Sequence, residues 1–244
     1  NRLSFFLMKY TTIITFLFLF TISYGQTNYE SGVVEFGVNF NNSIFKKIDN
    51  TRKKGDYNKR ALNSVEKLFK SHTKIYCSDI PFLKLYFTKH KYILKPIEIM
   101  LPENLQSKFI FQSDVYYVNF YNDNYLKHFK KRGNTYIALF IEEYICESKN
   151  QHKPKLGYQC RKAVLEIPNN NKVVAWFTPQ IPVAFSPVRY YGLPGAVLEI
   201  TTPLKHIYAK NIEFTDDVEV EKPTDGIKLT AEEYKQMMSG FKQD

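Results

Sequence analysis

The chain has 244 residues, of which 34 are lysine or arginine and 24 are aspartate or glutamate, so its formal net charge is +10. This length suits one domain with a full apolar core. A basic surface favours anionic contacts such as lipid headgroups, but the lysines are scattered along the sequence, which favours an ordinary solvated surface and argues against one dedicated basic stripe.

An apolar segment near the start predicts export. Lys9 precedes the run "TTIITFLFLFTI", and small residues at Ser23 and Gly25 occupy the positions that a signal peptidase reads. We expect residues 1–25 to comprise an upstream extension and a signal peptide cleaved after Gly25. Residues 26–244 would then form a single domain in the periplasm or cell envelope. Nucleic acid is not expected as a partner in that compartment.

The first half of the remaining chain predicts one helix among strands. Residues 32–40 read as the first strand, and a charged linker follows. Residues 56–72 place their apolar side chains on one helical face, which predicts an amphipathic helix. The alternation of apolar and polar residues then predicts paired strands, which are expected at 82–87 and 91–95, and at 115–121 and 125–130.

The second half predicts more strands and a short terminal helix. Strands are expected at 136–144, 160–167, 173–177, 196–202 and 207–214. Thr230 and Glu233 have the spacing of a capping box, which predicts a helix that ends near Phe241. The order predicts an α+β fold, a single domain dominated by a curved, half-barrel-like antiparallel meandering sheet.

Three cysteines follow the predicted cleavage point, and an oxidising compartment favours one disulfide among them. Cys146 and Cys160 flank a polar segment that reads as a loop between two strands, so we predict that they pair. Three buried thiols, including Cys77, are the alternative.

No catalytic constellation stands out, so we expect no enzyme activity, no cofactor and no metal site. His90 and His206 lie beside turns, with no serine or cysteine placed by the sequence to use them. Glu142 and Glu143 are adjacent on a predicted strand, so their carboxylates would point to opposite faces.

Aromatic residues make up 16% of the chain, which suits a curved sheet with a large apolar concave face. We predict that this face and the helix at 56–72 enclose a groove for an apolar ligand such as a lipid, an acyl chain or a peptide. The candidate lining residues are Leu62, Val65, Phe69, Trp176, Phe177 and Tyr191. The same side chains would serve equally in a solid core.

The stretch "YYGLPGAVLEITT" contains the turn Gly192, Leu193, Pro194 and Gly195. A phosphate-binding loop would lead into a helix, whereas this turn leads into a strand. It contains no nucleophile, which excludes a hydrolase elbow. The turn therefore reads as a structural corner in the sheet.

Three segments together, "GYQCRKAVLEI", "AWFTPQIPV" and "SPVRYYGLPGAVLEI", resemble the signature of the GLPGLI family, exported proteins of Bacteroidota. The chain departs from the signature where Ala196 and Val197 replace Leu and Ile. The resemblance implies a periplasmic or exported protein without an assigned activity. The predicted order of elements also resembles, more loosely, the half-open barrel of outer-membrane lipoprotein carriers.

Three functions follow from these observations. The first is a non-catalytic carrier or scaffold that holds an apolar ligand in the predicted groove. The second is a protein with a filled core that docks on an outer-membrane receptor through exposed strand edges and loops. The third is a hydrolase whose site the sequence does not reveal.

Overall fold

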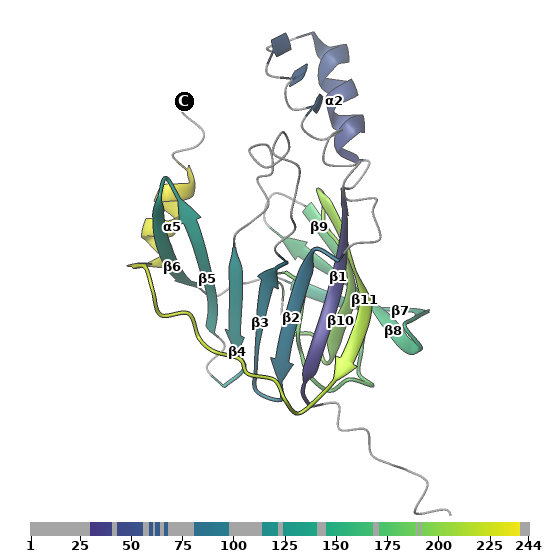
Figure 1. The fold of residues 1–244 in the computed structure, drawn as a ribbon. Coiled ribbons are helices and arrows are strands. Elements are labelled where there is room, and N and C mark those ends of the chain that lie inside the picture. Colours follow the sequence, from purple (N-terminus) through teal and green to yellow (C-terminus); the bar gives the residue numbers. More distant parts are fainter. Residues whose placement is uncertain are drawn as a thin grey trace, which may run out of the picture.

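A computed structural model provides the fold (Figure 1). It describes residues 30–40, 43–55, 59–60, 62–63, 66–67, 81–97, 114–121, 124–140, 145–167, 171–188, 190 and 192–239. The predicted signal peptide and Cys77 lie outside these ranges. None of the helices within them has the length and apolar character needed to cross a membrane.

The described strands form one 12-stranded sheet in the order β12-β6-β5-β4-β3-β2-β1-β11-β10-β9-β8-β7. Every neighbouring pair is antiparallel except β12 and β6. The strands are β1 (Gly32–Phe40), β2 (Leu83–Thr88), β3 (Lys91–Pro96), β4 (Val115–Asn119), β5 (Asn124–Lys131), β6 (Asn134–Phe140), β7 (Ile145–Lys155), β8 (Tyr158–Ile167), β9 (Asn171–Thr178), β10 (Ala196–Thr201), β11 (Lys205–Phe214) and β12 (Ile227–Leu229). The helices with bounds in the described chain are α2 (Ser43–Lys54) and α5 (Ala231–Ser239).

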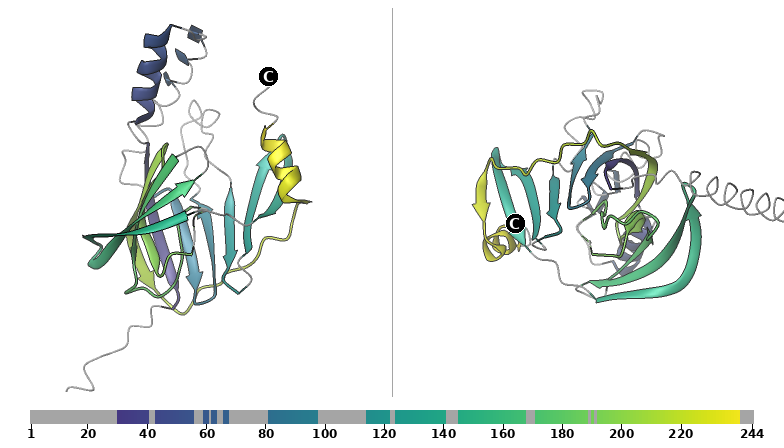
Figure 2. Two further views of the ribbon diagram at one scale, coloured as in Figure 1. Left: turned by 180° about the vertical axis from the view of Figure 1, so that it is seen from behind. Right: turned by 90° about the horizontal axis from the view of Figure 1, so that it is seen from below.

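The sheet is open and strongly curved, as the view along its strands shows (Figure 2). The first strand, β1, lies in the middle, because it pairs with β2 on one side and with β11 on the other. One wing is the meander β2 to β6, and the other runs from β11 back to β7. The predicted α+β fold with a curved antiparallel sheet is thus confirmed.

Side chains alternate between the two faces of the sheet, and one face holds the main core. On β1, Val34, Phe36 and Val38 point to the inner, concave face and are fully or almost fully buried. Their cross-strand partners share that face, for example Leu85 on β2 and Ile207 on β11. Burying each side chain of this size contributes roughly 1.5–3 kcal/mol, so this alternation fixes which face turns inward.

The connection between β9 and β10 runs inside the curve of the sheet, against its inner face (Figure 2). We name its described residues, 179–188, 190 and 192–195, the inner strap. Ile181, Val183 and Phe185 are buried, and the Phe185 ring lies 4.8 Å from that of Phe87 on β2. Val197 N–H at the start of β10 donates to the Phe185 carbonyl at 2.9 Å. The inner strap therefore belongs to the core.

A second connection crosses the outer, convex face. Residues 215–226, which we name the outer strap, run from β11 across the β2–β6 wing to β12 (Figure 1). Val220 is buried there against a cluster on β3 to β6 that consists of Ile93, Tyr117, Leu126 and Ile137. The outer strap thus covers apolar side chains that the sheet places on its outer face.

The C-terminal helix α5 follows β12. Glu233 N–H donates to Thr230 Oγ1 at 3.2 Å, and Thr230 N–H donates to Glu233 Oε2 at 2.7 Å, so the predicted capping box is confirmed. Tyr234 on α5 meets the Phe129 ring edge-on at 5.7 Å. The helix ends at Ser239 in the described chain, two residues before the predicted end.

The structure differs from the predicted elements at two segments. The predicted charged linker contains α2, which ends before Gly55, a glycine with a φ of +75°. The helix predicted at 56–72 is described at residues 59–60, 62–63 and 66–67, which are helical. The predicted polar loop before Cys160 is strand β7. It is an edge strand that is exposed along most of its length, and because neither of its faces is buried in a core, its sequence does not alternate between apolar and polar residues.

Candidate binding surface on the outer face

The Gly-Leu-Pro-Gly turn closes the inner strap. Gly192 and Gly195 have φ values of +91° and +134°, which favour glycine. A Cβ atom on Gly195 would lie 2.1 Å from the carbonyl oxygen of Thr178, so the turn approaches the end of β9 too closely for a side chain. Leu193 is buried and Pro194 is exposed. This geometry serves the packing of the strap.

The residues of the predicted groove do not line one surface. Trp176 and Phe177 are neighbours on β9, so their side chains point to opposite faces of the sheet. Phe177 is buried in the inner core, whereas Trp176 shares the outer face with Glu199. Leu62 lies in the helical segment beside α2, outside the sheet, and Val65, Phe69 and Tyr191 lie outside the described residues.

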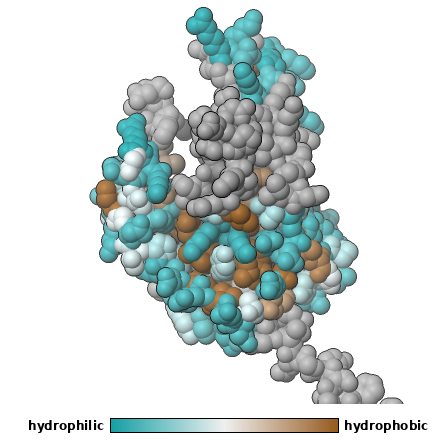
Figure 3. Space-filling model, viewed as in Figure 1, coloured by the Kyte–Doolittle hydropathy of each residue, from teal (hydrophilic) through white to brown (hydrophobic). Residues whose placement is uncertain are grey.

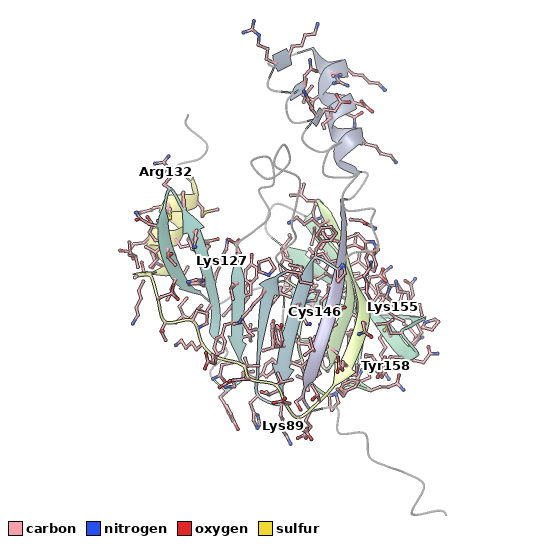
Figure 4. All side chains as sticks on the ribbon, viewed as in Figure 1. Lys89, Lys127, Arg132, Cys146, Lys155 and Tyr158 are labelled. Carbon is pink, nitrogen blue, oxygen red and sulfur yellow. The ribbon has the colours of Figure 1, made fainter. Side chains whose placement is uncertain are left out.

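A polar and aromatic cluster occupies the outer face of the β7–β11 wing. It is centred on Glu199, which β10 places opposite Tyr208 on β11 and Trp176 on β9. The hairpin of β7 and β8 forms the outer end of this wing, and Lys155 and Tyr158 are labelled on it in Figure 4. We name the following residues the Glu199 cluster: Lys153, Lys155, Trp176, Glu199, His206 and Tyr208.

Glu199 binds two basic side chains through its carboxylate. Lys153 Nζ lies 2.7 Å from Glu199 Oε1, and His206 Nε2 lies 3.0 Å from the same oxygen. The Glu199 side chain is 13% exposed, whereas those of Lys153 and His206 are 31% and 36% exposed. Burial alone would raise the pKa of Glu199, but the hydrogen bonds from His206 and Lys153 and their charges lower it to about 2. The carboxylate is therefore ionised at neutral pH.

Aromatic rings flank the carboxylate, and basic groups lie on their faces. Lys153 Nζ lies 4.3 Å from the centre of the Trp176 ring, and Lys155 Nζ lies 4.9 Å from that of Tyr208. His206 stacks on Tyr208 with ring centroids 5.3 Å apart. A Cβ atom on Gly37 would lie 2.7 Å from the Tyr208 ring, so the ring rests on this glycine of β1. The cluster is thus a partly exposed surface in which lysine ammonium groups lie over aromatic rings.

A buried cysteine lies beside this surface. Cys160 lies close to Lys153, but it is fully buried, and burial raises the pKa of its thiol to about 11. A thiol in that state is a poor nucleophile at neutral pH. Among the described residues, no three His, Cys, Asp or Glu side chains are placed to hold a metal ion. Glu142 and Glu143 lie outside the described ranges.

The predicted disulfide between Cys146 and Cys160 is wrong for this structure, in which both thiols are free. Cys146 stands opposite Leu165 and Cys160 stands opposite Lys153, so the two cysteines are offset by five positions along the paired strands. Five positions correspond to about 17 Å, whereas the Cα atoms of a disulfide lie about 4–7 Å apart. The error follows from reading β7 as a loop. Figure 4 labels Cys146, which is exposed.

The sequence pattern singles out two members of this cluster in other roles, His206 beside a turn and Trp176 in a groove or a core. One available signal was Glu199, a carboxylate inside the otherwise apolar strand "AVLEIT". The residues next to Lys153 in the sequence do not indicate its contact with Glu199, because that contact depends on the pairing of β7 with β8.

Comparison with known proteins supports the fold and leaves the function open. Residues 134–199, which run from β6 to Glu199 on β10, match the model of a family described as "Protein of unknown function (Porph_ging)". No curated protein matches the chain. Two solved structures of PNGF-II, in the space groups P21 and C2, have 15% and 14% sequence identity and TM-scores of 0.55 and 0.54.

Each alignment with PNGF-II covers 86% of this chain and 33% of the PNGF-II chain. The chain therefore spans about a third of the length of these proteins. At this identity the likeness concerns the fold alone. It shows that a similar sheet also occurs as one part of a longer chain.

Proposed function

We propose that this chain is an exported, non-catalytic scaffold protein of the cell envelope that docks on a partner protein through the Glu199 cluster. The observation that supports this proposal is the burial of the inner strap against the inner face of the sheet. The inner strap places Ile181, Val183 and Phe185 where a ligand of the concave face would lie, and all three are buried. The surface that remains for a partner is the outer face.

The alternative function is a carrier that holds an apolar ligand on the concave face. Such a ligand would have to displace the inner strap, which is tied to β10 by the hydrogen bonds Ala196 N–H to Ile181 O at 3.2 Å and Val197 N–H to Phe185 O at 2.9 Å. Breaking these bonds and exposing Phe185 would cost several kcal/mol. This cost favours the scaffold over the carrier.

The composition of the Glu199 cluster suits a protein partner that presents carboxylates beside apolar side chains. Trp176 and Tyr208 offer rigid aromatic surface, which is typical of residues that dominate binding energy at interfaces. Lys153 and Lys155 supply two positive charges against the single carboxylate of Glu199. An acidic partner segment would find complementary charge at the rim and rings at the centre.

Export and the cell envelope enter the proposal from the sequence. The apolar segment after Lys9 is typical of a signal peptide, and the three segments between residues 157 and 202 resemble the GLPGLI family. The family-model match at residues 134–199 overlaps these segments.

Affinity capture from detergent-solubilised envelope of the source cells tests the proposal. The baits are the wild-type chain, Lys155→Glu, which reverses the charge above the Tyr208 ring, and Lys172→Glu as a control with the same charge change. Lys172 is exposed on β9 and pairs with Glu166 at 3.3 Å, away from the cluster. We expect the wild type and the control to retain one stoichiometric protein that Lys155→Glu loses. Equal retention by all three baits would contradict the proposed surface.

A further inference from the structure

A helical hairpin stands apart from the sheet, beyond the end where β1 finishes (Figures 1 and 2). Its first arm is α2, and its second arm is described at residues 59–60, 62–63 and 66–67. Arg52 on α2 ties the arms together, because one of its Nη atoms donates to Asn63 Oδ1 at 3.2 Å and also contacts the Glu66 carboxylate. Ile48 on α2 is only 5% exposed. The hairpin therefore has internal contacts that hold its two arms together.

This hairpin carries a large share of the positive charge of the chain. Residues 43–67 contain eight lysines and arginines and three acidic residues, so their net charge is +5, half of the +10 of the whole sequence. The basic residues are spread over the whole chain, but in this projecting element few acidic residues balance them. The exposed cations in its described part are Lys46, Lys53, Lys59, Arg60 and Lys67.

The exposed surface of the hairpin is polar. In its described part, no exposed residue has an apolar side chain, and Leu62 is only partly exposed. Figure 3 shows this projecting part as strongly hydrophilic. An element that inserts into the boundary of a bilayer needs an apolar face turned outward. The described residues of the hairpin show no such face, and those that are exposed are polar or charged.

The kind of cation indicates the chemistry of the partner. Four of the five exposed cations are lysines, whose ammonium groups act as hydrated point charges and suit a diffuse polyanionic surface. Bidentate recognition of single carboxylates would favour arginine, and Arg52 is engaged within the hairpin. We propose that the hairpin docks the protein on an anionic bilayer surface through the phosphate groups of the lipid headgroups. This proposal is independent of the Glu199 cluster.

Vesicle sedimentation with the full chain tests this inference. One set of vesicles consists of phosphatidylcholine alone. The other contains about 30% phosphatidylglycerol, which gives it an anionic surface. The test variant combines Lys46→Gln, Lys53→Gln and Lys59→Gln, since glutamine keeps helix propensity and removes charge. The control combines Lys130→Gln, Lys222→Gln and Lys228→Gln, exposed positions on β5, the outer strap and β12. Both triple variants lower the net charge equally, and any contribution from the apolar N-terminal segment is common to all proteins.

We expect the wild type and the control to bind the anionic vesicles and to release them as salt rises, because exposed charges are screened. Each cation near an anionic surface contributes about a five-fold change in binding, so the hairpin variant is expected to bind roughly 100-fold more weakly. Equal losses in both triple variants would overturn the inference, as would equal binding to vesicles of phosphatidylcholine alone. Polyglutamate provides a further test. If it displaces the wild type from the vesicles at a lower concentration of negative charge than the anionic lipid needs for binding, the partner is an acidic polypeptide and the inference is overturned.

Discussion

Replacing Gly195 by alanine tests the close approach of the turn to the end of β9. The substituted Cβ atom would lie 2.1 Å from the carbonyl oxygen of Thr178 and 2.9 Å from the Cα atom of Pro179, and both neighbours are backbone atoms. They yield only if the inner strap or the end of β9 moves. The φ of +134° adds strain, because side-chain-bearing residues rarely adopt it.

The magnitude follows from these two costs and one compensation. Backbone strain costs about 1–3 kcal/mol, and overpacking costs a further 1–3 kcal/mol or so. Alanine restricts the unfolded chain and returns about 0.4–1 kcal/mol. We therefore expect Gly195→Ala to lower the free energy of unfolding by about 1–5.5 kcal/mol, and Gly195→Val by more, since its side chain is larger and branched.

Gly157→Ala is the matched control, because Gly157 has a φ of +83° and open space around its Cβ position. There the strain costs about 1–2 kcal/mol, and the same compensation leaves a loss of about 1 kcal/mol. The assay is urea unfolding followed by circular dichroism and by the emission of Trp176, the single tryptophan of the chain. If the two variants lose the same free energy of unfolding to within about 0.5 kcal/mol, the close approach of Gly195 to the Thr178 carbonyl is refuted.

Three further predictions concern the cluster, the last helix and the thiols. The pKa of Glu199 is lowered from 4.5 to about 2, so its charge stabilises the fold above pH 4.5 and this stability is lost as the pH falls towards 2. Between these pH values the wild type should lose at most about 3 kcal/mol more of its free energy of unfolding than Glu199→Gln does. The free energy is measured by urea unfolding at each pH, and an equal pH dependence in both proteins would disprove the coupling. Thr230→Ala removes the cap of α5 and should cost about 1 kcal/mol, with faster hydrogen exchange confined to residues 231–239; unchanged exchange there would rule out a role for the cap. Iodoacetamide at pH 8 should label exposed Cys146 in the folded protein and buried Cys160 only after unfolding, and a Cys146–Cys160 disulfide in a non-reduced peptide map would overturn the strand register.

The sequence predicted the strands whose side chains alternate between core and solvent. Residues 32–40 were predicted as a strand with the bounds of β1, because Val34, Phe36 and Val38 face the core between less buried neighbours. The edge strand β7 escaped the same test, since both of its faces are largely exposed and no period of two appears. The charged segment of α2 was missed because its apolar residues are few among lysines.

The candidate site depends on long-range pairing that no local pattern contains. Glu199 and His206 lie on adjacent strands joined by a short turn, but Lys153 comes from the far edge of the same wing. The predicted groove includes the adjacent residues Trp176 and Phe177, and strand alternation turns their side chains to opposite faces. The corner at Gly195 was predicted from its residue types, whereas its partner Thr178 is known only from the structure.

The central claim is that the inner strap occupies the inner face and that a partner protein binds the outer face. Native mass spectrometry tests this claim on the full chain, released from the envelope of its source cells in mild detergent. The account predicts the chain together with a stoichiometric protein partner, and loss of that partner from Lys155→Glu but not from Lys172→Glu. A copurified lipid that stays bound to Lys155→Glu would contradict it, because the ligand would then occupy the face that the inner strap is proposed to close.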